Sequence, residues 1–97
     1  MKILVIDDSS EYRNRWRNLL EILNHDVIEA EDGYQGIDQI KSHEDLNLII
    51  SDLHMPELNG IEMCRKIREE NLLVPKILMI TTEANPTLKK EGIKVGV

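Results

Sequence analysis

Three acidic side chains in this sequence stand at positions from which they could form one site. Asp7 and Asp8 directly follow the apolar run at residues 3–6, and Asp52 directly follows a second run at residues 48–51. Each run is short, lacks polar alternation and is followed by turn-forming residues, which is typical of a buried parallel strand. Because adjacent parallel strands end at the same edge of an open α/β sheet, we expect the three carboxylates to lie together there.

Carboxylates crowded in this way repel one another unless a cation lies among them. Oxygen ligands of this kind suit Mg²⁺, and Mn²⁺ is an alternative. A third apolar run at residues 77–80 ends at the hydroxyl groups of Thr81 and Thr82. The sequence therefore predicts a divalent cation site at one edge of a parallel sheet.

The elements that would hold this site alternate between strand and helix along the whole chain. Strands are expected at residues 2–6, 26–30, 47–51 and 76–80. Helices are expected from residue 9 or 10 to about 23, from 34 to about 42, from 61 to before 73, and from 86 to about 94. Right-handed crossovers would place these helices on both faces of the sheet.

The acidic strand ends imply that the first and third strands are neighbours. The predicted fold is therefore a flavodoxin-like, doubly wound α/β sheet with strand order 2-1-3-4. A chain of 97 residues fits one domain, residues 1–97. The residues expected to face inward from the first three helices are Tyr12, Trp16, Leu19, Leu20 and Leu23, then Tyr34, Ile37 and Ile40, and then Ile61, Cys64 and Ile67.

Composition argues against several classes of partner. The net charge of −6 and the aromatic fraction of 3% do not favour nucleic-acid binding. No run approaches the roughly 20 apolar residues of a membrane span. A single cysteine, Cys64, suits a reducing, cytoplasmic setting and is expected to be a core residue. The charged positions Glu11, Arg13, Arg15 and Arg17 are interpreted as the solvent-facing side of the first helix.

Three motifs in order resemble the receiver domain of two-component response regulators, in particular stand-alone chemotaxis regulators of the CheY type. They are Leu4-Val5-Ile6-Asp7-Asp8-Ser9, then Ser51-Asp52-Leu53-His54-Met55-Pro56, and then Met79-Ile80-Thr81-Thr82. The order and spacing fit over the whole chain, which makes the combination far more specific than any single motif.

The resemblance implies a role for each matching residue. Asp52 corresponds to the aspartate that accepts a phosphoryl group from a histidine kinase. Asp8 corresponds to a direct Mg²⁺ ligand, and Asp7 to its acidic neighbour that holds the metal through water. The backbone carbonyl of His54 corresponds to the third protein ligand. Phosphoryl transfer requires mainly positioning and charge neutralisation, which suits these residue types.

The resemblance also implies residues that respond to the phosphoryl group or tune its lifetime. Thr81 corresponds to the hydroxyl that moves toward the phosphoryl oxygens. Glu83 and His54 occupy the two variable positions that tune the lifetime of the phosphorylated state. A protein of this kind is not an enzyme beyond its own phosphotransfer and autodephosphorylation, and its output is a change in partner binding.

Family members continue into a fifth strand, which carries a Lys-Pro pair, and a fifth helix. The sequence, which ends at Gly96-Val97, is expected to lack both. The strand at residues 76–80 would then have an open apolar edge, which favours a homo-oligomer.

Two alternative functions are compatible with these residues. One is a self-assembling module that does not depend on phosphorylation. The other is a Mg²⁺-dependent phosphohydrolase that forms an aspartyl phosphate, although His54 stands where such enzymes commonly carry a second Asp.

Overall fold

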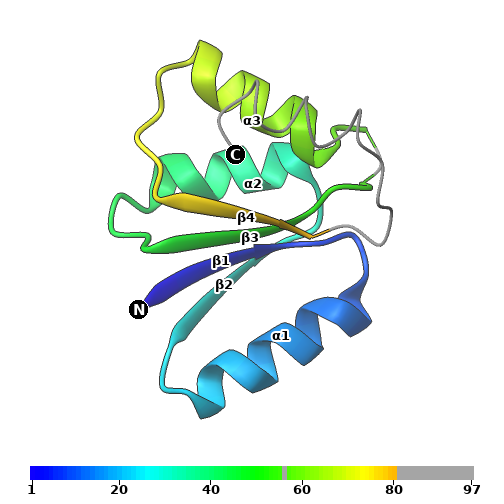
Figure 1. Cartoon of the computed structure of the whole chain (residues 1–97), viewed down its shortest axis with the longest axis vertical. Helices are drawn as coiled ribbons and strands as arrows, with labels where there is room; N and C mark the ends of the chain where they lie inside the picture. Colours follow the sequence, from blue (N-terminus) through cyan, green and yellow to red (C-terminus); the bar gives the residue numbers. More distant parts are fainter. Residues whose placement is uncertain (56, 81–97) are drawn as a thin grey trace.

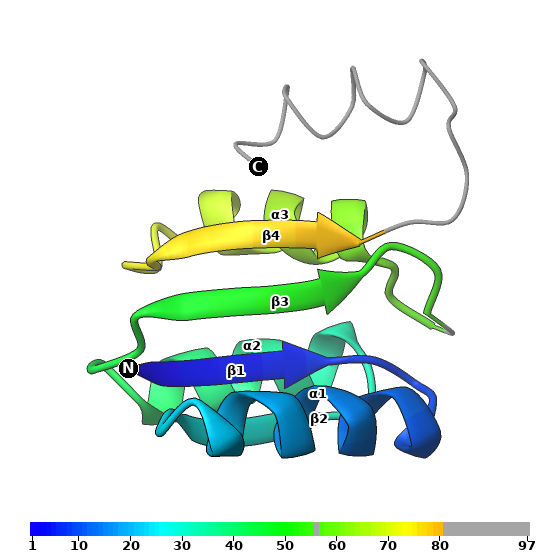
Figure 2. The same cartoon turned by 60° about the horizontal axis from the view of Figure 1, so that its bottom comes forward.

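A computed structural model of the protein describes residues 1–55 and 57–80. In chain order the elements are β1 (Lys2–Ile6), α1 (Ser10–Ile22), β2 (Asp26–Ala30), α2 (Gly33–Ser42), β3 (Leu48–Asp52), α3 (Gly60–Glu69) and β4 (Lys76–Ile80). The four strands form one parallel sheet with the order β2-β1-β3-β4, which confirms the predicted α/β topology. Figures 1 and 2 show α1 on one face of this sheet and α2 and α3 on the other.

The predicted bounds agree closely with this structure. β3 begins and ends one residue later than expected, at Leu48 and Asp52. The predicted helix at residues 86–94 lies outside the described residues. Within the described part of the chain, no helix is long and apolar enough to cross a membrane.

A short polar side chain caps the N-terminus of each helix in the described part of the chain. Ser9, Asp32 and Asn59 each accept a hydrogen bond from a backbone N–H in the first turn of α1, α2 and α3. Asn59 also forms a capping box with Glu62. These caps fix where each helix starts relative to the strand before it, and so they set the length of the loops at the carboxyl edge of the sheet.

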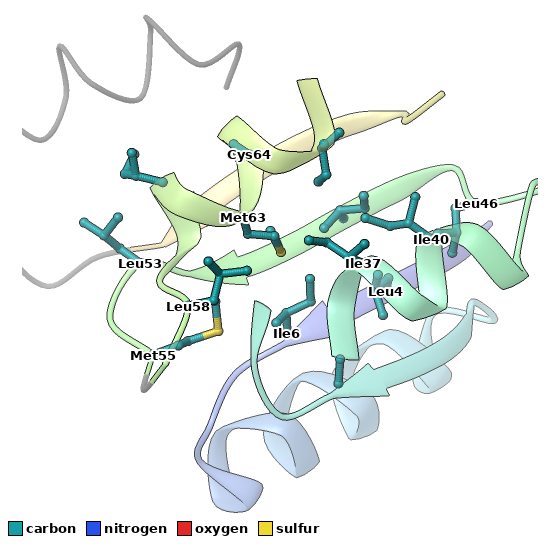
Figure 3. Close-up of a cluster of buried hydrophobic side chains, with 14 residues drawn as sticks. Leu4, Ile6, Ile37, Ile40, Leu46, Leu53, Met55, Leu58, Met63 and Cys64 are labelled. Atoms are coloured by element: carbon teal, nitrogen blue, oxygen red, sulfur yellow. The ribbon is translucent and has the colours of Figure 1, made fainter. Parts of the chain in front are cut away.

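The face of the sheet under α2 and α3 carries the main hydrophobic core (Figure 3). β1 contributes Leu4 and Ile6 to it, and the inward positions of α2 and α3 include Ile37 and Met63. Ile61, Cys64 and Ile67 are buried as predicted. Burial raises the pKa of the Cys64 thiol to about 11, as expected for a core residue.

The face under α1 is covered less completely. Leu20 is buried there with Ile3, Val5 and Ile50, and Trp16 packs against this cluster. The prediction that the whole apolar stripe of α1 faces inward is wrong, because Tyr12, Leu19 and Leu23 are exposed. A helix at the side of a sheet buries a stripe only as wide as its contact with the strands, and these residues lie beyond that contact.

Tyr34 of α2 also differs from its predicted position. Its side chain is 47% exposed instead of pointing into the core. The ring lies under the ammonium of Lys66, with Nζ at 5.9 Å from the ring centroid, so it bridges α2 and α3 at the surface.

Candidate functional site

The strand register brings the predicted acidic residues together. Ile6 of β1 pairs with Ser51 of β3, so the residues that follow, Asp7 and Asp52, come side by side at the carboxyl edge of the sheet. One carboxylate oxygen each from Asp7, Asp8 and Asp52 lies within 4.8 Å of the other two. The structure therefore confirms the predicted juxtaposition of the three side chains.

The first of the three, Asp7, is almost buried and is held on several sides. Its N–H donates to the carbonyl oxygen of Ala30 at 3.1 Å, and its Oδ1 accepts the N–H of Ser9 at 2.9 Å. Burial raises the pKa of the Asp7 carboxyl, and the charges of Asp52 and Asp8 add to this, while the Ser9 hydrogen bond opposes it. The protein therefore holds a carboxylate in a place that disfavours its negative charge.

The other two carboxylates differ in exposure. Asp8 is exposed, and Asp52 is half-buried at the end of β3. The Oδ1 atom of Asp52 accepts the backbone N–H of His54 at 3.3 Å, which orients the carboxylate at the mouth of the site. An anionic group that approaches from solvent thus meets Asp8 and Asp52 before it meets Asp7.

A divalent cation fits this donor set. Two oxygens bound directly to one Mg²⁺ lie at most about 4.2 Å apart, which is twice the usual bond length. Carboxylate oxygens spread over as much as 4.8 Å therefore suit a cation held directly by some of the groups and through water by another. Burial is the main cause of the raised pKa of Asp7, and a cation would relieve the repulsion that Asp52 and Asp8 add to it.

The loop after β3 is held close to the site by a glycine at the start of α3. The N–H of Gly60 donates to the carbonyl oxygen of Leu53 at 3.0 Å. A Cβ atom at residue 60 would lie 2.8 Å from the carbonyl oxygen of Asp52, so only glycine allows this approach. α3 is thereby packed directly against the strand end that carries Asp52.

Some predicted site residues lie outside what the structure describes. Thr81 and Glu83 fall outside the described residues, so their predicted roles stay predictions. His54 is described, with an exposed side chain, and its N–H bonds Asp52. The part assigned to its backbone carbonyl also stays a prediction.

Sequence reasoning missed Arg13, which it placed on the solvent-facing side of α1. The side chain is only 12% exposed, and its Nη1 donates to the carbonyl oxygen of Asp7 at 2.6 Å. A signal was present in the sequence, because Glu29 stands between the apolar residues Ile28 and Ala30 of the second strand, where a partly buried carboxylate favours a cationic partner.

Comparison with known proteins agrees with this geometry. The sequence matches the response regulator receiver domain family over residues 3–97, and the chain belongs to that family. It therefore takes part in two-component signalling based on phosphorylation.

Within the family, the chain is similar to chemotaxis regulators. The chemotaxis protein CheY homolog of Campylobacter jejuni (strain 81-176) is 41% identical over 99 residues, which covers 100% of this chain and 76% of that protein. Chemotaxis protein CheY1 of Helicobacter pylori (strain J99) is 39% identical over 100 residues and is covered to 80%. The crystal structure of Vibrio cholerae CheY4 superposes with a TM-score of 0.90 at 33% identity, covering 99% of this chain and 80% of that one.

Proposed function

We propose that Asp52 is the phosphoacceptor of this receiver domain and that a Mg²⁺ ion bound beside it supports the transfer. The observation that carries this proposal is the clustering of three carboxylates at the ends of β1 and β3. Asp8 and Asp52 bind the ion directly together with the carbonyl of His54, and Asp7 binds it through water. Mn²⁺ can replace Mg²⁺, because it accepts the same oxygen ligands.

The partner that supplies the phosphoryl group is a histidine kinase. An oxygen of Asp52 attacks the phosphorus atom, the P–N bond to the kinase imidazole breaks, and a mixed anhydride forms. A Mg²⁺ ion held by Asp8 and Asp52 would neutralise charge on the phosphoryl oxygens. The hydroxyl of Thr81 then binds the new dianion, while His54 and Glu83 tune how long it persists.

Asp52 suits the nucleophilic role better than its neighbours do. Asp7 is buried and already accepts the N–H of Ser9, so a phosphoryl donor has little access to it. Asp8 is exposed and is better placed to complete the metal site from the solvent side. Asp52 lies between these environments, with one oxygen oriented by His54.

Phosphorylation of the purified chain with acetyl phosphate and Mg²⁺ tests the acceptor. Intact-mass analysis should detect one added phosphoryl group on wild type and none on Asp52→Asn. Asp45→Asn is the matched control, because Asp45 is an exposed aspartate that pairs with Lys2 away from the site. Phosphorylation that persists in Asp52→Asn would contradict the assignment.

The metal is tested separately by calorimetric titration with Mg²⁺. Asp8→Ala should lose binding, whereas Asp45→Ala should bind as wild type does. Equal binding by Asp8→Ala and wild type would remove Asp8 from the ligand set.

A homo-oligomer through the β4 edge is a second functional possibility, favoured by one observation. Leu78 and Ile80 of β4 are 48% and 37% exposed, and within the described residues β4 pairs with β3 alone. A second copy would cover these side chains and pair the outer edge of the strand. The setting we propose for either form is the cytoplasm, where the single cysteine, Cys64, stays reduced.

Sedimentation at micromolar concentration, with and without Mg²⁺ and acetyl phosphate, distinguishes the two functions. Assembly that is the same with and without acetyl phosphate favours the self-assembling module. Leu78→Lys should abolish assembly, whereas Leu73→Lys, at a fully exposed loop position outside β4, should not. A compact monomer under every condition would exclude the homo-oligomer.

A further inference from the structure

The side chain of Arg13 joins three elements at the back of the acidic site. Its Nη1 donates to the carbonyl oxygen of Asp7 at 2.6 Å, and its Nε donates to Oε1 of Glu29 at 3.2 Å. Arg13 belongs to α1, Asp7 follows β1, and Glu29 lies in β2. A guanidinium donates from separate nitrogens of a planar fork and so holds two acceptors in fixed directions, whereas an ammonium donates from a single nitrogen on a flexible stem.

Glu29 is itself held in place from its other side. Its second oxygen, Oε2, accepts Nε and Nη2 of Arg17, each at 2.8 Å. Arg17 is one turn beyond Arg13 on α1, and its Nη1 also donates to Glu21 at 3.0 Å. Both oxygens of Glu29 are therefore engaged by α1, and the carboxylate is a fixed anchor for Arg13.

The hydrogen bond from Arg13 fixes the peptide that joins Asp7 to Asp8. The carbonyl of Asp7 and the N–H of Asp8 belong to the same planar unit, so orienting one orients the other. The N–H of Asp7 is bonded to Ala30, and the N–H of Ser9 is bonded to the Asp7 side chain. Together with Arg13, these bonds leave the backbone at Asp8 with little freedom.

We propose that Arg13, anchored by Glu29, is a positioning residue that aims the Asp8 carboxylate into the acidic site. The inference rests on the proposed binding of Mg²⁺ by Asp8 and Asp52. Groups that orient metal ligands typically change metal affinity by about 10- to 100-fold when they are removed. A purely electrostatic role has the opposite sign, because a cation close to the site repels Mg²⁺ and its removal would tighten binding.

The sharpest variant is Arg13→Lys, which keeps the positive charge and removes the fork. We expect Mg²⁺ affinity, measured by calorimetry, to fall about 10-fold. Glu29→Gln, which removes the anchor and leaves Arg13 in place, should lower the affinity by a smaller factor. Arg15→Ala is the control, because Arg15 is an exposed arginine of the same helix that bonds Glu11 and should leave affinity unchanged.

A second readout requires no metal. In Arg13→Lys, the amide resonances of Asp8 and Ser9 should shift and their hydrogen exchange should accelerate, while the amide of Ile50 in β3 exchanges as in wild type. An effect confined to residues 8 and 9 separates local positioning from general destabilisation, which would raise exchange in β3 as well.

Three results would overturn the inference. These are tighter Mg²⁺ binding in Arg13→Lys, unchanged Mg²⁺ affinity, and unchanged exchange at Asp8 and Ser9. If wild type itself fails to bind Mg²⁺, the proposed metal site is wrong, and the exchange measurement alone then decides whether Arg13 orders the peptide.

Discussion

The two faces of the sheet are held in different ways. Under α2 and α3, fourteen of the described side chains are buried in one apolar cluster. Under α1, four are buried, and part of the contact is polar, through the pairing of Arg13 and Arg17 with Glu29. β4 forms the sheet edge farthest from β2, and its residues Leu78 and Ile80 are exposed instead of being buried on either face.

This difference indicates that the two faces contribute differently to the stability of the fold and to the geometry of the site. The apolar face fixes the parallel strands and the position of α3, and so it sets where Asp52 stands. The α1 face adds directional hydrogen bonds, and these reach the backbone of the site itself at Asp7. Apolar burial supplies most of the stability, whereas polar contacts supply orientation.

The largest effect is expected from the core of the apolar face. Met63 of α3 is completely buried, and Met63→Ala should lower the free energy of unfolding by about 2–5 kcal/mol. Ile22→Ala is the control, because Ile22 lies on the outer side of α1 and is 77% exposed. Urea unfolding measures both variants. A similar loss of unfolding free energy in Met63→Ala and Ile22→Ala would contradict the contrast between the two faces.

The next effect tests how closely α3 must approach β3. Gly60→Ala places a methyl group 2.8 Å from the carbonyl oxygen of Asp52 and against the Met79 side chain. Because a backbone carbonyl cannot move aside, we expect a loss of about 1–3 kcal/mol in unfolding free energy. Gly36→Ala meets only flexible side-chain ends, those of Ile6 and Met63, and should cost less. The reverse order would show that the fit at α3 is not controlled by the Asp52 carbonyl.

Much of the apolar face could be predicted from the sequence. Short apolar runs closed by turn residues located the strands to within one residue, and acidic residues after two of them required those strands to be neighbours. Helical spacing identified Ile37, Ile61 and Ile67 correctly, because α2 and α3 lie against both the sheet and each other. The inference that those two strands are neighbours also predicted the acidic cluster, and the structure brings the three carboxylates together.

The α1 face could not be predicted in the same way. Helical spacing places Tyr12, Leu19 and Leu20 on one face of α1, but it does not show how much of that face the sheet covers. Only Leu20 of these three is buried. Arg13 was misplaced for a related reason, since its role depends on the distance from α1 to Glu29 and to the Asp7 carbonyl, which is set by tertiary packing.

A smaller effect is expected at Asp7, which directly follows β1 and whose carbonyl oxygen accepts a hydrogen bond from Arg13 of α1. Burial, with help from Asp52 and Asp8, raises the pKa of Asp7 above its usual 3.8, so the folded protein binds this proton more tightly than the unfolded chain does. The contribution of Asp7 to stability therefore falls as pH rises from about 3.8 through the raised value. At neutral pH without Mg²⁺, the ionised group lowers stability.

Asp7→Asn removes this charge and keeps an oxygen that can accept the Ser9 N–H. We expect the variant to melt at a higher temperature than wild type at pH 7 without Mg²⁺, and the gain to shrink as the pH is lowered. In Asp45→Asn the sign should be opposite, because the hydrogen bond from Lys2 lowers the pKa of Asp45. A melting temperature of Asp7→Asn below that of wild type would show that the ionised carboxylate does not lower the stability of the folded protein.

The smallest effect is expected on the outer side of α1. Leu19 is 52% exposed, and Leu19→Gln should change the free energy of unfolding by no more than about 0.5 kcal/mol. Its neighbour Leu20 is 8% exposed, and Leu20→Gln should cost several kcal/mol because it buries an amide. Trp16 fluorescence, which reports the cluster around Leu20, should change in the second variant only. A loss above about 2 kcal/mol in Leu19→Gln would mean that this side of α1 is covered in solution, and dependence of that loss on protein concentration would identify the cover as a second copy of the chain.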